Sequence, residues 1–376
     1  MALNWVEIDL AALRHNFAQV QHCVGSRTAI LAVVKSDAYG HGMIPVAREL
    51  AKAGAHFFGV SKCWEALKLR SAGIRQPIVV LAGMEAEDAP TVIAYDLRPA
   101  VYRLDHCRLL DEAAQHAGKV ARIHLKLDTG MGRLGVPVRD LEPFLDQMAS
   151  LKHVHVEGVF SHLATADEAD KTFSKEQMAR FRGALQRLHD RSITFEYAHI
   201  ANSGAVLDIP EAHGQLVRAG IMLYGSPPSE DIQSPVHLRP VMALKTKILQ
   251  VKWVPSGHSI GYGRTFVCSR PTRIATIAVG YDDGYPRALS NRGEALVHGV
   301  RVPIVGRVSM NLITLDVTHV PGAAPDDEVV LLGTQGTERI SAEEIAQKAH
   351  TISYEIYCAI GKNPQRLFLN SSGHLA

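Results

Sequence analysis

The first two thirds of the chain alternate short apolar runs with longer amphipathic segments. Apolar runs bounded by turn residues are typical of buried strands. They lie at Ala29–Val34, His56–Val60, Pro77–Ala82, Arg98–Val101, Arg122–Leu127, His153–Phe160, Thr194–Ile200 and Gln215–Arg218. Segments with helical periodicity separate them, among them Leu10–Val24, Pro45–Ala53, Trp64–Ser71, Leu104–Ala117 and Ser174–Asp190. This alternation predicts βαβ units and a parallel sheet.

The number of repeats favours one α/β architecture over another. Eight strand–helix repeats in roughly 200–250 residues fit a closed (β/α)₈ barrel of the TIM type. A doubly wound open sheet is the alternative, but it usually carries a Gly-rich fingerprint after its first strand, which is missing here. We therefore expect an N-terminal barrel.

The pattern changes at Ser226–Pro235, where Pro, Ser and acidic residues crowd together as in an interdomain linker. We expect a barrel domain over residues 1–235 and a mostly-β domain over residues 236–376. Expected strands of the second domain are Val241–Val251, Arg273–Val279, Ala295–Val297, Arg301–Val305, Leu312–Val317 and Glu328–Leu332. One helix interrupts them, because Ser341 and Glu344 form a capping-box pattern ahead of Ile345–Ala349.

Composition narrows the function classes. The 376 residues are 47% hydrophobic and 21% charged, with a formal net charge of +2 and no block of like charge. A nucleic-acid partner would need a clustered basic face, so we expect none. The start lacks the pattern of a secretory signal, and no apolar run reaches membrane-spanning length. Five scattered cysteines favour reduced thiols in the cytoplasm, and the histidines show no metal-ligand spacing.

The segment AILAVVKSDAYGHG, residues 29–42, carries the most distinctive chemistry. Its apolar run delivers Lys35 to a strand end, and Tyr39 follows four residues later in a polar loop. A lysine beside a dry sheet loses hydration, which disfavours its ammonium form. The neutral amine is a nucleophile that can form a Schiff base with a carbonyl compound or with pyridoxal 5'-phosphate (PLP).

Further polar residues follow other strand ends in the same direction. They are Lys126 with Arg133 at the fifth run, His162 after the sixth, Asn202 and Ser203 after the seventh, and Arg218, Gly220 and Ile221 at the eighth. In barrels of this kind the chemistry sits at the carboxyl ends of the strands, so we expect one shared site. The Ser203 hydroxyl and the backbone N–H groups of Gly220 and Ile221 can hold a phosphate, with Arg218 directed toward the barrel centre.

Ten motifs in order along the chain resemble the alanine racemase family of PLP-dependent amino-acid racemases (fold type III). They are WVEIDLAALRHN, VVKSDAYGHG, LKLDTGMGRLG, FSHLATAD, HIANSGA, VRAGIMLYG, SIGYGRTF, VGYDDGYPR, GRVSMN and ISYEI. The resemblance implies a barrel followed by a β domain, and a homodimer whose active sites are completed by the partner chain. The implied reaction interconverts L-alanine and D-alanine. Its use, in supplying D-alanine for peptidoglycan or in degrading L-alanine, stays open.

The resemblance also implies roles for single residues. Lys35 would hold PLP and act as one catalytic base, and Tyr262 of the partner subunit would be the other. Implied cofactor-binding residues are Tyr39, His162, Asn202, Ser203, Arg218, Gly220, Ile221 and Tyr354. Arg218 would pair with the pyridine nitrogen, and His162 would link Arg218 to Tyr262.

Substrate contacts are implied in the same way. Arg133 and the backbone of the partner's Met310 would hold the substrate carboxylate, and Lys126 matches a position that is carbamylated in some members. Residues resembling the family's substrate corridor are Asp167, Tyr281, Arg287, Arg307, Ile352 and Tyr354. Two positions depart from the pattern, since Ser36 replaces a usual Ala and Asn311 replaces a common Asp.

Asn311 leaves two readings of substrate range. An Asn that makes similar hydrogen bonds would preserve alanine specificity, whereas the lost charge would admit serine or larger amino acids. A PLP-dependent decarboxylase of the same architecture is disfavoured by Arg218 and Tyr262. Non-catalytic PLP-binding proteins are single barrels, which the second domain disfavours. An exported broad-specificity racemase is disfavoured by the missing signal sequence.

Overall fold

The computed structural model describes residues 3–370, which divide into two compact units. The barrel unit comprises residues 14–38 and 43–238, and the β unit comprises residues 3–13, 39–42 and 239–370. None of the helices within residues 3–370 has the length and apolar character needed to cross a membrane.

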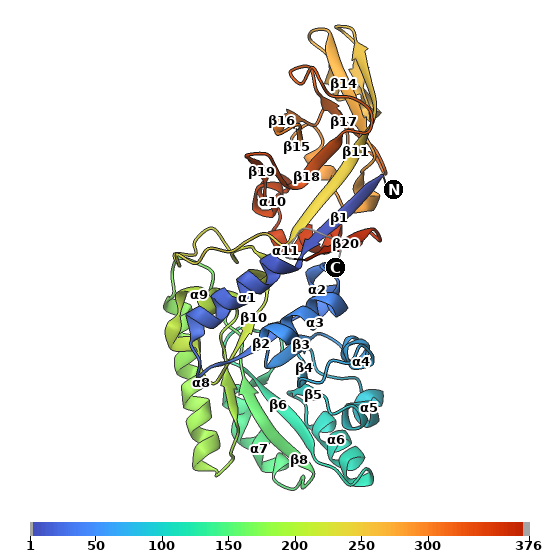
Figure 1. The fold of residues 1–376 in the computed structure, drawn as a ribbon. Coiled ribbons are helices and arrows are strands. Elements are labelled where there is room, and N and C mark those ends of the chain that lie inside the picture. The colour runs from blue at the N-terminus through green and yellow to red at the C-terminus, as the bar shows by residue number, and fades with distance from the viewer. Residues whose placement is uncertain (1–2, 371–376) are drawn as a thin grey trace. The chain divides into compact units, whose positions relative to one another are not determined.

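Eight parallel strands form the core of the barrel unit (Figure 1). They are β2 (Ala29–Val33), β3 (Phe57–Val60), β4 (Ile78–Val80), β5 (Arg98–Val101), β6 (Ala121–Asp128), β8 (Val154–Phe160), β9 (Tyr197–His199) and β10 (Leu216–Ala219). Their hydrogen-bonded order is β10-β2-β3-β4-β5-β6-β8-β9. The two end strands also approach each other, because the N–H of Gln215 donates to the carbonyl of Ala198 at 3.2 Å. The sheet is therefore a nearly closed barrel, which confirms the predicted fold class over an open sheet.

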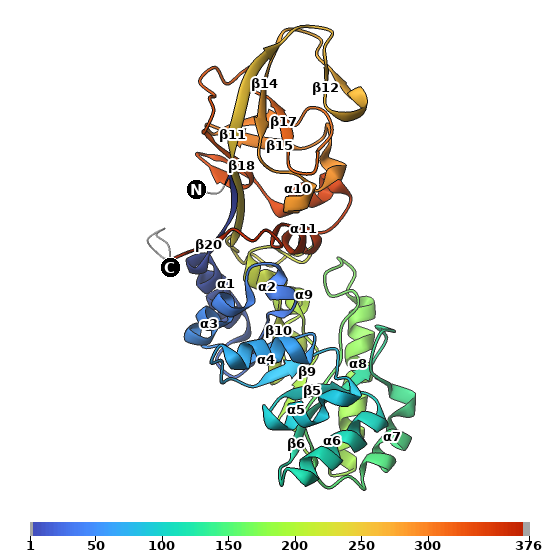
Figure 2. The ribbon, with the colours of Figure 1, turned by 90° about the vertical axis from the view of Figure 1, so that its right-hand side faces the viewer.

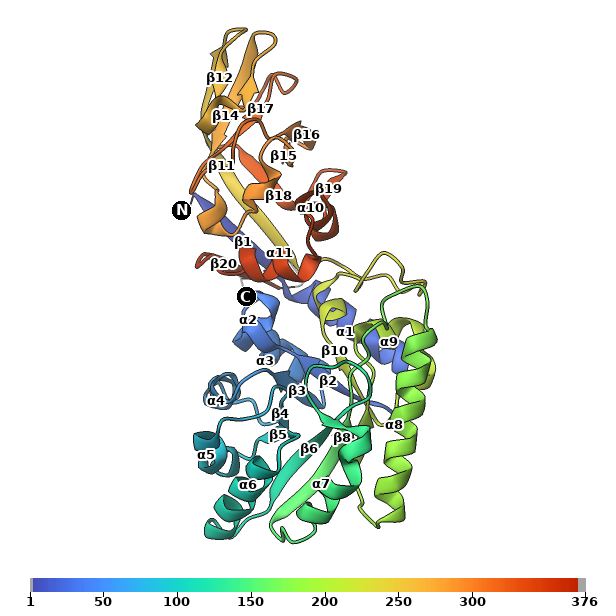
Figure 3. The same ribbon diagram turned by 180° about the vertical axis from the view of Figure 1, so that it is seen from behind.

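Helices cover the outside of this barrel; Figure 3 shows α7 and α8 along its outer face. The helices are α1 (Leu10–Val24), α3 (Met43–Ala53), α4 (Cys63–Ser71), α5 (Ala89–Ala94), α6 (Leu104–His116), α7 (Leu141–Met148), α8 (Thr172–Asp190) and α9 (Ser203–Asp208), and the short strand β7 (Val136–Pro137) pairs with β6. In α3 the buried positions Met43, Val46, Ala47 and Leu50 follow helical spacing. That spacing places one apolar stripe against the barrel.

The barrel strands are buried on both faces, which explains their continuous apolar runs. In β3 all four residues are buried, and β5 is buried throughout although it contains Arg98. Charged side chains are seldom buried without partners, so an arginine inside a buried strand is expected to pair with a buried acceptor. Other buried polar residues on these strands are His124, Lys126, Glu157, His199 and Arg218.

The β unit is organised around the long strand β11 (Met242–Val254), which is drawn beside β14 and β18 in Figure 2. Strand β11 pairs antiparallel with β1 (Asn4–Asp9), β14 (Thr272–Ile277) and β18 (Glu328–Gln335), and β1 pairs parallel with β20 (Arg366–Leu369). The remaining strands are β12 (Ser259–Ile260), β13 (Phe266–Val267), β15 (Glu294–Val297), β16 (Val300–Pro303), β17 (Ile313–Asp316) and β19 (Glu338–Ile340). These pairings place the start of the chain in the β unit.

The expectation of a single helix in the second domain is wrong. The structure contains α10 (Ala342–Ala349) and also α11 (Ser353–Ile360). The sequence of α11, SYEIYCAI, is rich in residues that favour strands, and its helical burial period spans only eight residues. In α10 the Ser341 hydroxyl accepts a bond from the Glu344 N–H at 3.2 Å, as the capping pattern predicts. The Glu344 carboxylate instead pairs with Arg301 and Lys348.

Candidate active site

Lys35 follows β2 at the carboxyl end of the barrel strands and opens a turn of unusual handedness, α2 (Lys35–Tyr39). The next four residues, 36–39, all have φ between 54° and 56°. This left-handed conformation costs about 1–2 kcal/mol for each non-glycine residue. Two bonds offset the strain: Ser36 N–H donates to Glu65 Oε1 at 2.6 Å, and Met43 N–H donates to Asp37 Oδ1 at 2.8 Å. Strain that is held by such partners is typical of functional sites.

Lys126 and Arg133 form a cationic cluster with Lys35 and Arg218 in the barrel unit, and His162 lies beside these four side chains. Lys126 is buried, and its Nζ lies 5.3 Å from the centre of the Phe160 ring. Burial, followed by the positive charges of Arg218, Arg133 and Lys35, lowers the pKa of Lys126 to about 8. Burial and the four cations lower the pKa of His162 well below its usual range. These five strand-end residues therefore lie near enough to one another in the barrel unit for their charges to interact.

Arg218 lies on β10 and is buried among neutral partners. One terminal nitrogen, Nη1, donates to Nδ1 of His199 at 3.0 Å and to its carbonyl at 3.0 Å. The other, Nη2, donates to the carbonyls of Ser161 and Ile200 and to Nδ1 of His162 at 3.1 Å. Among residues 3–370, no hydrogen bond engages Nε of Arg218. This donor is the one left for an acceptor on a bound ligand.

Ser203 and Gly220 lie within hydrogen-bond distance of each other. The N–H of Gly220 donates to Oγ of Ser203 at 2.9 Å, and Ile221 is buried at the start of the short 3₁₀ turn Ile221–Tyr224. Asn202 has a role that its motif did not indicate: Oδ1 accepts from Ala205 N–H at 3.1 Å and caps α9. It therefore positions Ser203, the first residue of that helix.

Two of the predicted phosphate-binding tyrosines meet within the β unit. The rings of Tyr39 and Tyr354 have centroids 5.9 Å apart. Burial, and then the neighbouring Cys358, raises the pKa of Tyr39. Gly40 next to it has φ of +83°, and a Cβ there would lie 2.4 Å from the carbonyl oxygen of Tyr357. Only glycine allows residue 40 to approach α11 this closely.

Other predicted residues of the β unit are exposed. Tyr262 is 72% exposed, Met310 55%, Ile352 59% and Tyr281 42%, and Arg287 and Arg307 are also exposed. The Arg307 guanidinium lies against Gly263, next to Tyr262, because a Cβ on that glycine would lie 3.0 Å from Cζ. Asn311 donates to Asp282 Oδ2 at 3.5 Å. Asp167, in the barrel unit, is half-buried, and its carbonyl accepts from Ser229.

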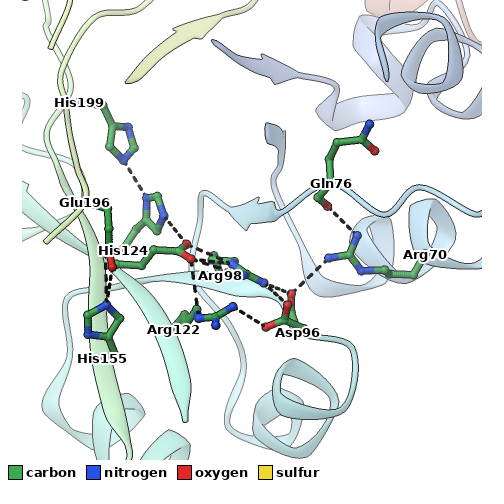
Figure 4. Close-up of polar contacts among 10 residues, drawn as sticks. Arg70, Gln76, Asp96, Arg98, Arg122, His124, His155, Glu196 and His199 are labelled. Carbon is green, nitrogen blue, oxygen red and sulfur yellow. Dashed lines mark hydrogen bonds and ion pairs between the residues drawn. The ribbon is translucent and has the colours of Figure 1, made fainter. Parts of the chain in front are cut away.

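Four buried polar residues were missed by the sequence reasoning: Arg98, His124, Glu157 and His199. They make a chain of polar contacts across the barrel interior (Figure 4). Each interrupts an apolar strand, as in RIHLKL and HVEGVF, and that interruption was the available signal. It could not be used because strand periodicity alone does not tell which polar residues meet.

Comparison with known families decides the relationship of the chain. Residues 8–228 match the model of the alanine racemase N-terminal domain, and residues 241–368 match that of the alanine racemase C-terminal domain. The chain belongs to the alanine racemase family. It is 59% identical to the alanine racemase of Syntrophobacter fumaroxidans over 98% of each chain. This confirms the resemblance seen in the motifs and the expectation of an enzyme, an amino-acid isomerase.

Solved alanine racemases share the whole fold. The alanine racemase of Clostridium difficile 630 superposes with a TM-score of 0.94 at 32% identity, covering 100% of this chain and 98% of that one. The alanine racemase of Bartonella henselae, solved with covalently bound pyridoxal phosphate, superposes with a TM-score of 0.89 at 29% identity, covering 98% and 100%. Both the barrel unit and the β unit therefore have counterparts in these enzymes.

Proposed function

We propose that this enzyme racemises alanine with PLP, using Lys35 and Tyr262 of the partner subunit as its two bases. The observation that carries the proposal is the environment of Arg218. A buried guanidinium that meets only neutral groups has an uncompensated charge, which a bound anionic or electron-rich ligand would stabilise. Family membership, and the pyridoxal phosphate bound in a solved relative, support PLP as that ligand.

The residues of the barrel unit fit this cofactor. Bound PLP supplies an electron sink that lets an amino acid lose its α-proton. The Lys35 amine stands at a strand end and provides the covalent attachment. The Ser203 hydroxyl is proposed to donate its proton to the phosphate, while Gly220 N–H, which donates to Ser203 Oγ, holds that hydroxyl in place and Ile221 N–H is a further proposed contact. Nε of Arg218 is the donor left for a pyridine nitrogen. In the β unit, Tyr39 and Tyr354 are proposed as further phosphate contacts.

Racemisation needs a proton to leave one face of the substrate Cα and another to arrive on the opposite face. A single base returns the proton to the face from which it came. Lys35 Nζ and Oη of Tyr262 of the partner subunit would serve the two faces. Each base must be uncharged or deprotonated at the moment when it accepts the α-proton.

Arg218 would also select the reaction type. A guanidinium keeps its proton, so a ring nitrogen facing it stays unprotonated. A ring held in that state by Arg218 would be a weaker electron sink and would leave more negative charge at the substrate Cα. Reprotonation at Cα is thereby favoured over transfer of the amino group.

A homodimer is proposed from the exposed apolar side chains of the β unit. Tyr262, Tyr281, Met310 and Ile352 are each more than two fifths exposed, and burying them against another chain would remove apolar area from water. A second copy of the chain is the proposed cover. All five cysteines are free, which supports a reducing compartment, the cytoplasm.

The test combines spectroscopy and product analysis. Purified enzyme loaded with PLP is reduced with borohydride, and the labelled peptide is identified by mass spectrometry. We expect the visible band to disappear and the label to lie on Lys35, with Lys126 as the matched unlabelled control. L-Alanine is expected to give a racemic mixture on chiral analysis. Label on another lysine, or alanine that stays optically pure, would overturn the proposal.

Asn311 supports a second candidate, a racemase of broader range. Its amide donates to Asp282, whereas an aspartate in its place would repel that carboxylate. The neutral side chain thus alters charge beside Met310. Comparing kcat/KM for alanine, serine and larger amino acids in the wild type and in Asn311→Asp decides between the two. Broad activity that narrows in the variant favours the broader racemase.

A further inference from the structure

A series of buried polar contacts runs from Arg218 through the barrel interior to the opposite strand ends, and Figure 4 shows the part from His199 to Arg98. Arg218 Nη1 contacts Nδ1 of His199 at 3.0 Å, and Nε2 of His199 contacts Nδ1 of His124 at 2.8 Å. Nε2 of His124 then contacts Oε2 of Glu157 at 3.3 Å, and Arg98 Nε donates to the same oxygen at 3.1 Å. Both imidazoles are fully buried. The contacts join Arg218 to a carboxylate two imidazoles away.

Only one arrangement of protons satisfies this chain while both imidazoles are neutral. Arg218 can only donate, so Nδ1 of His199 must accept and its single proton lies on Nε2. That proton is donated to Nδ1 of His124, whose own proton must then lie on Nε2. It is donated in turn to the Glu157 carboxylate, which can only accept. Every N–H therefore points away from Arg218 and toward Glu157.

The electrostatics of the site hold both ends in the required state. Burial acts to raise the pKa of Glu157, but the bond from His124 and the charge of Arg98 outweigh it and lower that pKa to about 2. Burial lowers the pKa of His124 and lowers that of His199 well below its usual range. The bond to Glu157 and its negative charge act to raise the pKa of His124, but burial, with the charges of Arg98 and Arg218, outweighs them. The two rings are thus neutral between a cation and an anion.

Two features of the barrel backbone make room for these polar side chains. The register between β6 and β8 shifts so that Ile123 pairs with Val156 while His124 pairs with Gly158, leaving Glu157 as the extra residue. Such bulges redirect side chains near functional sites. A Cβ on Gly158 would lie 2.6 Å from Nδ1 of His124, so the glycine makes room for the ring. Two independent backbone features therefore serve the His124–Glu157 contact.

At the end opposite Arg218, the series of polar contacts reaches the protein surface. Arg98 Nη1 pairs with Asp96 Oδ2 at 2.7 Å, and the Asp96 side chain is 65% exposed. Glu157 is the buried anion at the strand ends opposite Arg218, where it pairs with Arg98 and lies 4.0 Å from Nε of Arg122, which also pairs with Asp96. This placement compensates Arg218 from a distance while its immediate neighbours stay neutral.

We propose that His199, His124 and Glu157 are positioning residues that orient Arg218 and fix it as a proton donor toward the cofactor. This inference rests on the proposed function for its catalytic consequence, but the proton arrangement stands independently of any cofactor. A carboxylate directly beside Arg218 would bind its N–H groups and reduce its effect on a ligand. Two interposed imidazoles stabilise the charge and leave that effect intact.

The proton arrangement is tested by nitrogen NMR of full-length protein labelled at its 19 histidines. Signals of His124 and His199 are assigned by their loss in His124→Gln and His199→Gln. We expect both rings to be neutral with the proton on Nε2, unchanged from about pH 5.5 to pH 9. A charged ring or a proton on Nδ1 of either histidine overturns the proposal. This measurement needs neither cofactor nor activity.

The catalytic consequence is tested in Glu157→Gln. The matched control is Glu196→Gln, which breaks an exposed bond of 3.0 Å to His155 on the same strand as Glu157. We expect kcat for alanine to fall about 10–100-fold in Glu157→Gln with little change in KM, as for other residues that orient a functional group. Because the anion is lost, the absorption band of the bound cofactor should also titrate at a lower pH than in the wild type. The control changes neither quantity.

Two outcomes distinguish this inference from the proposed function. If the wild type racemises alanine but Glu157→Gln keeps its kcat and its band position, the positioning role is wrong while the function stands. If the wild type does not racemise alanine, the proposed function is wrong, and NMR alone decides the proton arrangement. Where Glu157→Gln fails to fold, Glu157→Asp is used instead. Its shorter side chain keeps the negative charge but moves it farther from Nε2 of His124. The same shifts, smaller in size, are then expected, and unchanged kcat and band position overturn the positioning role.

Discussion

At the residue scale, the site depends on charges that are placed in a dry interior without an adjacent counter-ion. Arg218 meets carbonyls and neutral imidazoles, and Lys126 lies over the face of Phe160. Such groups are costly to bury, so they are retained where a bound ligand uses them. The same residue types on the surface would keep ordinary pKa values, because water would solvate their charges.

Replacing Arg218 with glutamate should change the reaction that the enzyme performs. A carboxyl group can share a proton with the pyridine nitrogen, which makes the ring a stronger electron sink. We expect the rate of cofactor transamination to rise by at least about tenfold, equivalent to about 1.4 kcal/mol in the barrier. The measurement follows formation of the aminated cofactor by absorption during turnover of alanine. An unchanged side-reaction rate would contradict this role of Arg218.

Lys126 should become carbamylated as the pH rises. Carbon dioxide reacts with the neutral amine, and a pKa of about 8 leaves a large neutral fraction at pH 8 and above. We expect a carbamate signal that grows between about pH 7 and pH 9 in protein supplied with labelled bicarbonate, and that is missing in Lys126→Met. An ordinary lysine would remain charged over this range.

The same shift has a consequence for stability with a defined sign. The folded state releases the Lys126 proton near pH 8, whereas the unfolded chain holds it until about pH 10.4. The unfolded state therefore binds more protons in this window, and the Lys126 contribution to stability becomes more favourable as the pH rises through it. Lys126→Met should remove that dependence in denaturant titrations at several pH values.

At the scale of elements, the left-handed turn after β2 is a strained device held by its neighbours. The φ values of residues 36–39 lie where only glycine is comfortable, yet none of the four is glycine. Glu65 is buried and receives N–H bonds from Ser36, Ser61 and Lys62, so a single carboxylate ties the turn to the start of α4. The turn fixes the direction of the backbone immediately after Lys35.

Asp37 should contribute to this turn as a helix cap does. Its Oδ1 accepts from the N–H of Met43, the first residue of α3, at 2.8 Å. We expect Asp37→Ala to lower the free energy of unfolding by about 1 kcal/mol, since that donor loses its partner. Asp37→Asn, which keeps an acceptor oxygen, should retain most of the stability. Equal losses in both variants, measured by urea denaturation, would argue against the cap.

At the scale of the whole molecule, the proposed site needs two chains. The exposed side chains of Tyr262, Tyr281 and Met310 belong to the β unit, whereas Lys35 and Arg218 belong to the barrel unit. In a homodimer, each barrel unit would be completed by the β unit of the partner. Activity would then depend on protein concentration around the dimer dissociation constant.

Mixing two inactive variants tests this sharing of sites. Homodimers of Lys35→Ala and of Tyr262→Phe each lack one base in both sites. A mixed dimer of the two contains one site with both bases and one with neither. After dissociation and reassociation, half of the dimers are mixed, so we expect about a quarter of wild-type activity to return. A mixture that stays inactive after proven exchange would show that Tyr262 does not act across chains.

The apolar periodicity alone determined most elements of the barrel. Each of the eight predicted strand runs overlaps an observed strand, and β5 (Arg98–Val101) matches in full, because strands buried on both faces leave uninterrupted apolar runs. Helix α1 was likewise predicted at Leu10–Val24. The ten motifs identified the family, because ten short segments in a fixed order are far less common by chance than any single one.

Only the tertiary structure decided which residues meet across distant parts of the chain. It placed β1 beside β11 and β20, it revealed α11, and it brought His199, His124 and Glu157 into one polar chain. These outcomes depend on strand register, on a bulge at Glu157 and on space beside Gly158. Local periodicity contains no information on register between strands, so a sequence determines which residues are buried more readily than which buried residues touch.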